Sequence, residues 1–275
     1  MASAVPTSDA RRIVRGLRLP DQLAIWGGLG ALSALAWLYL WRMPAGGGAS
    51  MDGMAGMAGM AGMAGMPGMS MASPWSPAQL WLTFLMWAVM MVAMMLPSAA
   101  PMVAMYARVA EGRGASPRMR VWLFAGGYVA AWTAFSAVAT LLQAAMDHAA
   151  MLSGAMRVAP LMGGVILALT GAYQLSPLKR RCLRHCQSPL GFLMTHWRDG
   201  RTGAIAMGLG HGVFCVGCCW MLMALLFVAG VMNLLWVAAL TGFVLIERAT
   251  RWGETLATAS GFALIAAGLA LAALS

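Results

Sequence analysis

Four side chains that can bind a metal or exchange thiols lie close together in the apolar stretch AMGLGHGVFCVGCCWMLM. At about 100° per residue, His211, Cys215, Cys218 and Cys219 share an arc of roughly 100° on a helix, with Met207 beside it. Imidazole and thiolate are good ligands for Cu(I) and Zn(II), and ionisable groups in a membrane helix are functional candidates by default. The pattern predicts a metal or redox site; the alternative is small apolar cysteines and a histidine that bonds a neighbouring helix.

A second set of soft ligands is the methionine-rich half of the stretch WLTFLMWAVMMVAMMLPSAAPM. Its methionines recur at helical spacing, while leucine and valine fill the other half, and Pro97 and Pro101 are expected to break or kink the helix. Methionine also fills irregular packing gaps, which is the alternative interpretation. The predicted metal-contacting residues are Met86, Met90, Met91, Met94 and Met95.

A third set lies in the low-complexity segment MDGMAGMAGMAGMAGMPGMSM, where methionine recurs every third residue. With so much glycine the segment cannot offset the entropy of folding, so we expect a flexible tether. Thioethers favour Cu(I) or Ag(I), and several on one chain raise the local ligand concentration; a neutral linker made by repeat slippage is the alternative. The predicted capture residues are Met51, Met54, Met57, Met60, Met63, Met66 and Met69.

The loop sequence SPLKRRCLRHCQSP places Cys182 and Cys186 four residues apart, with His185 between them. On a helix the two thiols share a face, which would suit a cytoplasmic relay site. A basic surface segment with incidental thiols explains the same pattern. Further on, Glu247 beside Arg248 is expected to form an ion pair at a helix end.

The amino-acid composition indicates that these candidate metal ligands lie in a membrane protein. The chain has 275 residues, of which 61% are hydrophobic and 9% charged, against about 25% charged in soluble domains. The surplus apolar surface must face lipid, and only helices of about 20 residues satisfy their own backbone there. We therefore predict an all-α polytopic membrane bundle of about seven transmembrane helices, at Gln22–Trp41, Ala78–Met105, Val121–Ala145, Val158–Leu175, Gly203–Val228, Val231–Ile246 and Thr255–Leu274.

The net charge of +10 follows topology rather than nucleic-acid binding. With the N-terminus in the cytoplasm, all 18 Lys and Arg residues except Arg42 and Arg157 fall on the inner side, as the positive-inside rule requires. This predicts a multi-pass protein of a bacterial inner membrane with no nucleic-acid partner. The expected parts are a basic cytoplasmic tail at 1–20, a first transmembrane helix at 21–42, a disordered extracytoplasmic segment at 43–77 and a six-helix core at 78–275.

Four motifs in order resemble a bacterial family of unknown function described as predicted metal-binding integral membrane proteins. They are W-x-x-M-M-V-A-M-M-L-P-S at Trp87–Ser98, P-L-K-R-R-C-L-R-H-C at Pro177–Cys186, G-H-G-V-F-C-V-G-C-C-W at Gly210–Trp220 and G-V-M-N-L at Gly230–Leu234. The resemblance covers residues 78–255 and implies metal binding. The family often has Glu-Lys where this chain has Glu247–Arg248, so a role specific to lysine there is in doubt.

Together these patterns predict that the chain binds Cu(I) within the bilayer for transport or for delivery to a periplasmic or membrane copper protein. Zn(II) is the alternative ion, although zinc would not explain the thioethers. No G-x-x-x-x-G-K-[ST] phosphate loop is present, so transport would not be driven by a nucleotide bound there. The competing hypothesis is an enzyme, a membrane thiol-disulfide oxidoreductase using Cys215, Cys218 and Cys219, because Cys215 and Cys218 have the C-x-x-C spacing.

Overall fold

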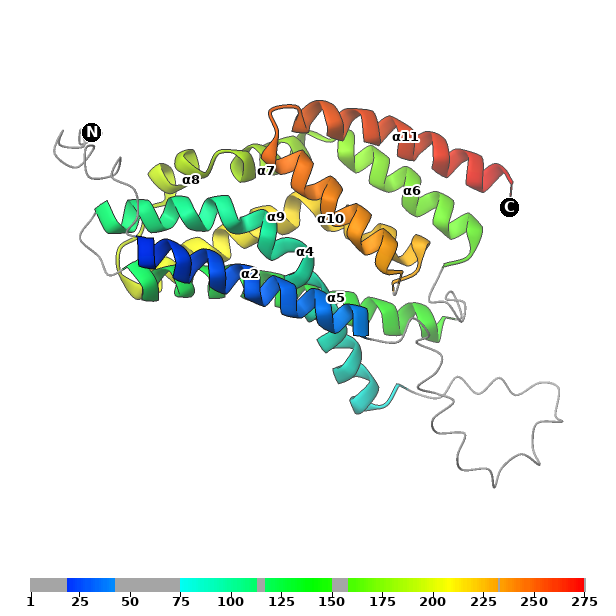
Figure 1. Cartoon of the computed structure of the whole chain (residues 1–275). Helices are drawn as coiled ribbons and strands as arrows, with labels where there is room; N and C mark the ends of the chain where they lie inside the picture. The colour runs from blue at the N-terminus through cyan, green and yellow to red at the C-terminus, as the bar shows by residue number, and fades with distance from the viewer. Residues whose placement is uncertain (1–18, 43–74, 113–116, 150–157, 232, 275) are drawn as a thin grey trace, which may run out of the picture.

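The computed structural model describes residues 19–42, 75–112, 117–149, 158–231 and 233–274, and this part of the chain is all helical, without strands. The methionine-rich residues 51–71 lie outside the described residues. The helices, labelled in Figure 1, are α2 (Leu19–Arg42), α4 (Pro77–Gly112), α5 (Pro117–His148), α6 (Pro160–Leu175), α7 (Pro177–Gln187), α8 (Pro189–His196), α9 (Gly200–Ala229), α10 (Leu234–Ala249) and α11 (Gly253–Ala273).

Five of these helices are long and apolar enough to cross a membrane: α2, α4, α5, α9 and α11. Helix α6 passes the same test only together with α7, from which it is bent by 64°. Helix α10 has 16 residues, about 24 Å at the standard rise, which is shorter than a hydrocarbon core of about 30 Å. The helical fold is confirmed, while the seven-span count and the side of the N-terminus stay predictions.

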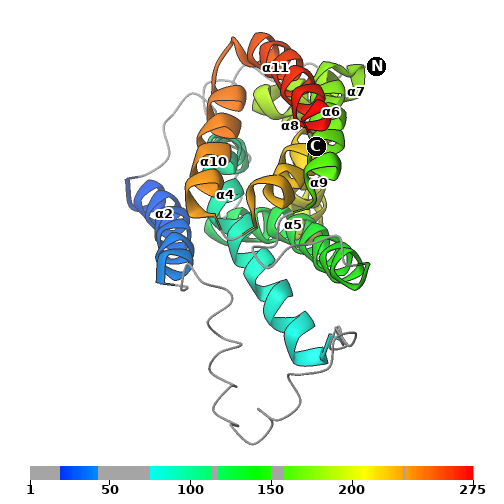
Figure 2. The ribbon, with the colours of Figure 1, turned by 90° about the vertical axis from the view of Figure 1, so that its right-hand side faces the viewer.

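Helix α4 positions the methionine face. It runs as one helix through Pro97 and Pro101, so of the two expected outcomes, a break or a kink, the structure shows the kink (Figure 1). Its outer part stands away from the other helices in Figure 2. Helix α2 packs on its flank, where Trp37 Nε1 donates to the carbonyl oxygen of Ala93 at 3.1 Å.

Glycine lets the pairs α5–α9 and α6–α11 approach closely. A Cβ on Gly212 would lie 2.6 Å from Ala131 Cβ, and one on Gly268 would lie 2.6 Å from Gly164 O. Among the glycines of α9, Gly208 and Gly212 face α5, and Gly217 faces Cys182 of α7. The helices α6 and α11 lie side by side in Figures 1 and 2.

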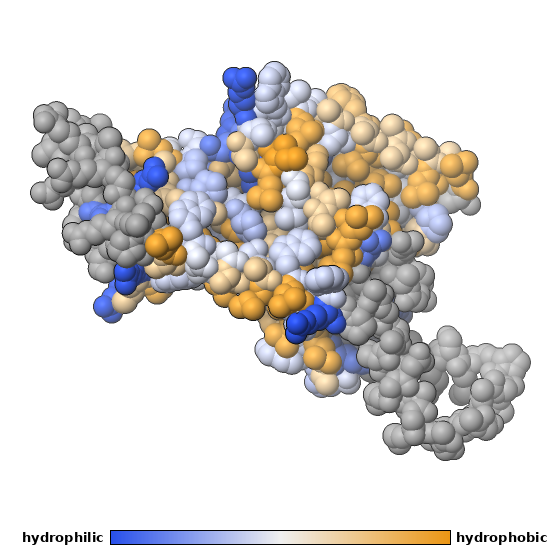
Figure 3. Space-filling view, in the orientation of Figure 1, coloured by the Kyte–Doolittle hydropathy of each residue, from blue (hydrophilic) through white to orange (hydrophobic). Residues whose placement is uncertain are grey.

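Large hydrophobic side chains cover the outside of the bundle, as lipid contact requires. Over α6 and α11 they form a broad apolar surface (Figure 3) that includes Leu161, Leu169, Phe262 and Leu269. The inside of the bundle holds other aromatic residues, such as Trp87, Trp132 and Tyr128, together with three cysteines and several polar groups. The side chains that could bind a metal therefore lie between the helices.

Candidate metal site

The cysteines of α9 point into the bundle. Cys215 and Cys218 are 0% exposed and Cys219 is 1% exposed, with Met207 and His211 buried on the same helix. All five cysteines of the chain are free thiols. Cys218 and Cys219 each donate to the carbonyl oxygen of Cys215, so the three sulfurs occupy one level of the helix. The amphipathic arc predicted for this helix is therefore an inward-facing thiol cluster, which we define as Cys215, Cys218 and Cys219.

Arg248 of α10 lies against all three sulfurs of the thiol cluster. Its Nη1 donates to Cys215 Sγ at 2.8 Å, and its Nη2 donates to Cys218 Sγ at 3.1 Å and to Cys219 Sγ at 3.3 Å. Nη1 also donates to Ser98 Oγ of α4 at 2.8 Å. A guanidinium stays protonated in proteins, so a permanent positive charge stands beside three buried thiols.

Sequence reasoning missed this contact because it paired Arg248 with Glu247, and that interpretation is wrong. Glu247 pairs with Lys179 of α7 at 2.7 Å, and both side chains are fully buried. Consecutive helical residues diverge by about 100°, so Glu247 and Arg248 of α10 face α7 and α9 respectively. The apolar residues around Glu247 and Arg248 could have indicated these contacts, because charged side chains inside a membrane bundle usually pair with a group on another helix.

Tyr128 of α5 joins the thiol cluster to the methionine helix, and sequence reasoning also missed it. Its hydroxyl lies 2.8 Å from Cys215 Sγ and donates to the carbonyl oxygen of Met95 at 3.0 Å. Ser98 completes a second link, since its hydroxyl donates to the same carbonyl while accepting from Arg248. The inner end of the methionine run therefore adjoins the thiol cluster through one tyrosine and one serine.

The five predicted methionines of α4 are buried, from Met86 at 5% exposed to Met91, Met94 and Met95 at 0%. They belong to the same continuous core as Met207 and the thiol cluster. These thioethers therefore face the interior of the bundle, where methionine is also a good packing residue.

The two cysteines of α7, Cys182 and Cys186, lie beside the thiol cluster. Helix α7 begins with Pro177 at its first turn, and the Ser176 side chain caps it by accepting from Lys179 N. It packs along α9 so that Cys186 Sγ is 4.0 Å from Cys218 Sγ, and Cys182 Sγ would be 3.0 Å from a Cβ on Gly217. The neighbouring His185 stacks on Phe214 with ring centroids 4.4 Å apart.

His211 occupies an aromatic pocket rather than joining the guanidinium contacts. Its ring stacks near Tyr128 at 5.7 Å and meets the edge of Phe192 at 5.6 Å. Its Nδ1 is buried and has no hydrogen-bond partner among the described residues. Within those residues, no three His, Cys, Asp or Glu side chains are gathered as a ready metal cage. Metal binding by the thiol cluster therefore requires local rearrangement.

Comparison with known proteins gives one match. The family model described as PpoB2, copper chaperone, matches residues 84–271, which include the methionine face of α4 and all five cysteines. No curated protein and no solved structure matches the chain.

Proposed function

The chain belongs to the PpoB2 copper chaperone family, and on that premise we propose that it binds Cu(I) inside the membrane and passes it to a copper-requiring protein. The metal ligands are Cys215, Cys218 and Cys219, with His211 and Met207 nearby on α9. The protein is a multi-pass component of a bacterial inner membrane, and its partner is a periplasmic or membrane copper protein.

The observation that carries the proposal is that neighbouring buried thiols lie against one group, the Arg248 guanidinium. Three come from α9, and Cys186 of α7 adds a fourth sulfur 4.0 Å from Cys218. Thiolate and thioether donors select soft monovalent ions, whereas hard ions prefer oxygen. Two thiolates binding one Cu(I) leave a net negative charge, and the fixed positive charge of Arg248 offsets it in this apolar surrounding.

Loading the site requires the Arg248 guanidinium to shift. Its nitrogens lie 2.8–3.3 Å from the three sulfurs, so the group occupies the centre of the cluster. A metal–sulfur bond is about 2.3 Å for ions of this size, and the ion would compete with the guanidinium for the same sulfurs. Ser98 Oγ and the Cys215 carbonyl oxygen already accept from Arg248 and can retain it after the shift.

In this proposal, the other soft ligands bind Cu(I) one after another before and after the thiol cluster. Met51, Met54, Met57, Met60, Met63, Met66 and Met69 capture Cu(I) at the outer face, and the methionine face of α4 conducts it to the thiol cluster. If the protein transports the ion inward instead of delivering it to a partner, the ion would pass from Cys218 to Cys186 and then to Cys182 and His185. The 4.0 Å gap between Cys186 and Cys218 supports that step, because one metal ion can bridge two sulfurs at this spacing.

Metal analysis of the purified protein tests the proposal. The variants Cys215→Ser, Cys218→Ser and His211→Ala should each bind less copper than wild type after Cu(I) loading, with the serine variants losing most. Met223→Leu is the matched control, because Met223 is a fully buried methionine of α9 outside the cluster. Copper content that is the same in wild type and all three variants would exclude the site.

The competing thiol-disulfide function predicts a different outcome. It requires a reversible disulfide between Cys215 and Cys218 that turns over with a partner in the absence of metal. Alkylation of free thiols followed by peptide mass spectrometry measures this directly in membranes. A metal-free protein that cycles between dithiol and disulfide while binding no copper would favour the enzyme over the chaperone.

A further inference from the structure

Helix α5 carries a row of buried polar side chains along one face. Ser136, Thr140 and Gln143 are between 0% and 4% exposed, although they lie in an apolar membrane helix. At about 100° per residue, the row occupies an arc of roughly 120°. Polar residues in such helices are costly and mark functional paths by default. From the outer end inward, the row is Asp147, Gln143, Thr140, Ser136, Trp132 and Tyr128.

The row follows the seam between α5 and the methionine face of α4. At its outer end, Gln143 Oε1 accepts from Trp87 Nε1 of α4 at 2.7 Å. At its inner end, Tyr128 donates to the carbonyl oxygen of Met95. Because both ends contact α4, Ser136 between them lies along the same seam. Over this length α4 buries the thioethers of Met90, Met91 and Met94.

Both ends of the row connect to predicted metal-handling groups. The inner end is Tyr128, whose hydroxyl is 2.8 Å from Cys215 Sγ of the thiol cluster. The outer end is Asp147, whose Oδ2 accepts from Trp75 Nε1 at 2.8 Å. Trp75 follows Met71, the last methionine of the low-complexity segment, by four residues. The described chain therefore resumes, at Trp75, beside the outer end of the row.

One buried atom in the seam requires a partner that the helices do not supply. Trp132 Nε1 is buried and has no hydrogen-bond partner within the described part of the chain. Such a donor costs about 1–3 kcal/mol unless water or another acceptor reaches it. One turn away, the Ser136 hydroxyl donates to the carbonyl oxygen of Trp132, and Thr140 donates to that of Ser136. Both hydroxyl oxygens keep lone pairs for water or a cation.

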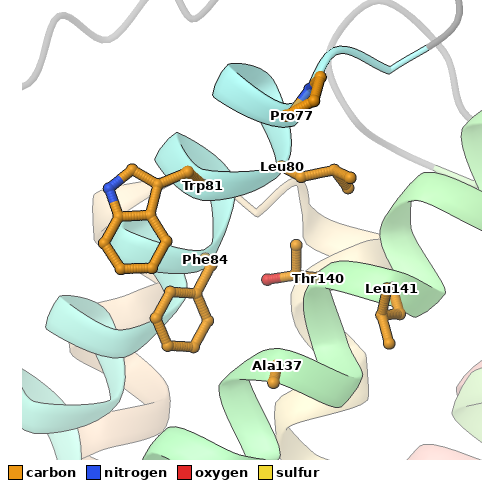
Figure 4. Close-up of a pocket in the computed structure, with 7 residues that line it drawn as sticks. All are labelled: Pro77, Leu80, Trp81, Phe84, Ala137, Thr140 and Leu141. Carbon is orange, nitrogen blue, oxygen red and sulfur yellow. The ribbon is translucent and has the colours of Figure 1, made fainter.

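An open, mainly apolar groove of about 430 Å³ lies at the outer end of the same seam, between Trp81 and Phe84 of α4 and Leu141 of α5. Thr140 also lines it, and its hydroxyl oxygen points into the space between the two helices (Figure 4). The groove brings the surface of the bundle to the level of Thr140, one turn from Ser136.

We propose that the α4–α5 seam is a hydrated entry path for the soft monovalent cation, with thioethers of Met90 and Met94 on one wall and the hydroxyls of Ser136 and Thr140 on the other. The identity of the ion rests on the proposed function. The thioethers replace part of its hydration shell, and water bound to the hydroxyls and to Trp132 retains the rest. The seam is packed shut at Ser136, so passage requires the outer part of α4 to move relative to α5.

Water access along the seam is the first test, and it needs no bound copper. Cysteine is introduced by Ser136→Cys or Thr140→Cys, and a positively charged, membrane-impermeant methanethiosulfonate is added to the outer face of spheroplasts. Peptide mass spectrometry then measures labelling at each position. His148→Cys is the exposed positive control, and Val138→Cys, 63% exposed on the lipid side, is the matched negative control.

We expect labelling at positions 136, 140 and 148 and none at 138, and Ag(I) should slow labelling at 136 by about tenfold, equivalent to about 1.4 kcal/mol. A Ser136→Cys protein as unreactive as Val138→Cys would overturn the path. So would labelling at 136 only from the inner face. If wild type binds no metal, the proposed function fails, but the labelling pattern still decides whether the seam is hydrated.

A bulky side chain placed in the seam gives a second test, in which the rate of metal loading is measured. Ser136→Leu should slow Ag(I) loading of the thiol cluster from the outer face by about tenfold, while the metal content at equilibrium stays that of wild type. Val138→Leu, on the outward face of the same helix, should load at the wild-type rate. Equal loading rates for Ser136→Leu and Val138→Leu would overturn the path.

Discussion

At the scale of single residues, the adjacent charges Glu247 and Arg248 divide two tasks between two helices. Glu247 neutralises Lys179 of α7, and Arg248 faces the thiol cluster of α9. The periodicity of α9 was enough to predict that His211 and the cysteines share one buried face, because that property belongs to a single helix. Their partners Arg248 and Tyr128 come from α10 and α5, and contacts between helices cannot be read from the period of either one.

The buried ion pair should be sensitive to the loss of one partner. Glu247→Gln leaves the Lys179 ammonium without its countercharge in an apolar interior, so we expect the free energy of unfolding to fall by about 3–5 kcal/mol. The double variant Lys179→Met, Glu247→Leu should recover most of the loss because no charge remains unpaired. Unfolding in detergent micelles, followed by tryptophan fluorescence, measures both.

The exposed pair Arg184–Glu254 is the control for that experiment. Its side chains are 68% and 38% exposed, so water and salt screen the interaction. Arg184→Ala should unfold like wild type. If Glu247→Gln is equally neutral, the Lys179–Glu247 pair is not a structural link between α7 and α10.

At the scale of elements, length and apolarity predicted the long helices well. The predicted spans at 78–105, 121–145 and 203–228 fall within α4, α5 and α9, whose ends extend a few residues beyond the predicted apolar runs. The short predicted spans at 158–175 and 231–246 became the 16-residue helices α6 and α10. Their lengths are fixed by Ser176, Pro177 and Asn233, and composition alone does not say whether such short helices cross a bilayer.

Packing between α6 and α11 should depend on its glycines. A Cβ on Gly268 would lie 2.6 Å from Gly164 O, a backbone atom that cannot move alone. Gly268→Ala should therefore destabilise the protein by about 1–3 kcal/mol through overpacking. Gly242→Ala is the matched control, because a Cβ there meets nothing within 4 Å and the better helix propensity should leave stability unchanged or raise it by up to about 1 kcal/mol. Equal stability of the two variants, measured by thermal unfolding in micelles, would contradict this packing.

At the scale of the whole molecule, the distribution of charge orients every proposed site. The positive-inside pattern places the methionine segment and the outer end of α5 on the same side, opposite to α7 and its cysteines. Arg248, however, is 8% exposed and bound to thiols, so only Arg251 remains as a solvated basic anchor between α10 and α11. The side on which α11 begins therefore depends on one basic residue, Arg251, and on whether α10 crosses the membrane.

Topology reporters at the two termini decide this point. With seven spans, a C-terminal alkaline phosphatase fusion should be active because its enzyme folds only outside, and a C-terminal green fluorescent protein should stay dark. A reporter placed after residue 50 should also report the outer side, while one at the N-terminus should report the cytoplasm. If the C-terminal fusions report the cytoplasm but the residue-50 fusion stays outside, α10 does not cross, six spans remain and the entry path through α4 and α5 keeps its direction. If residue 50 reports the cytoplasm, the methionine segment cannot capture copper from outside, and the proposed flow toward Cys186 is reversed.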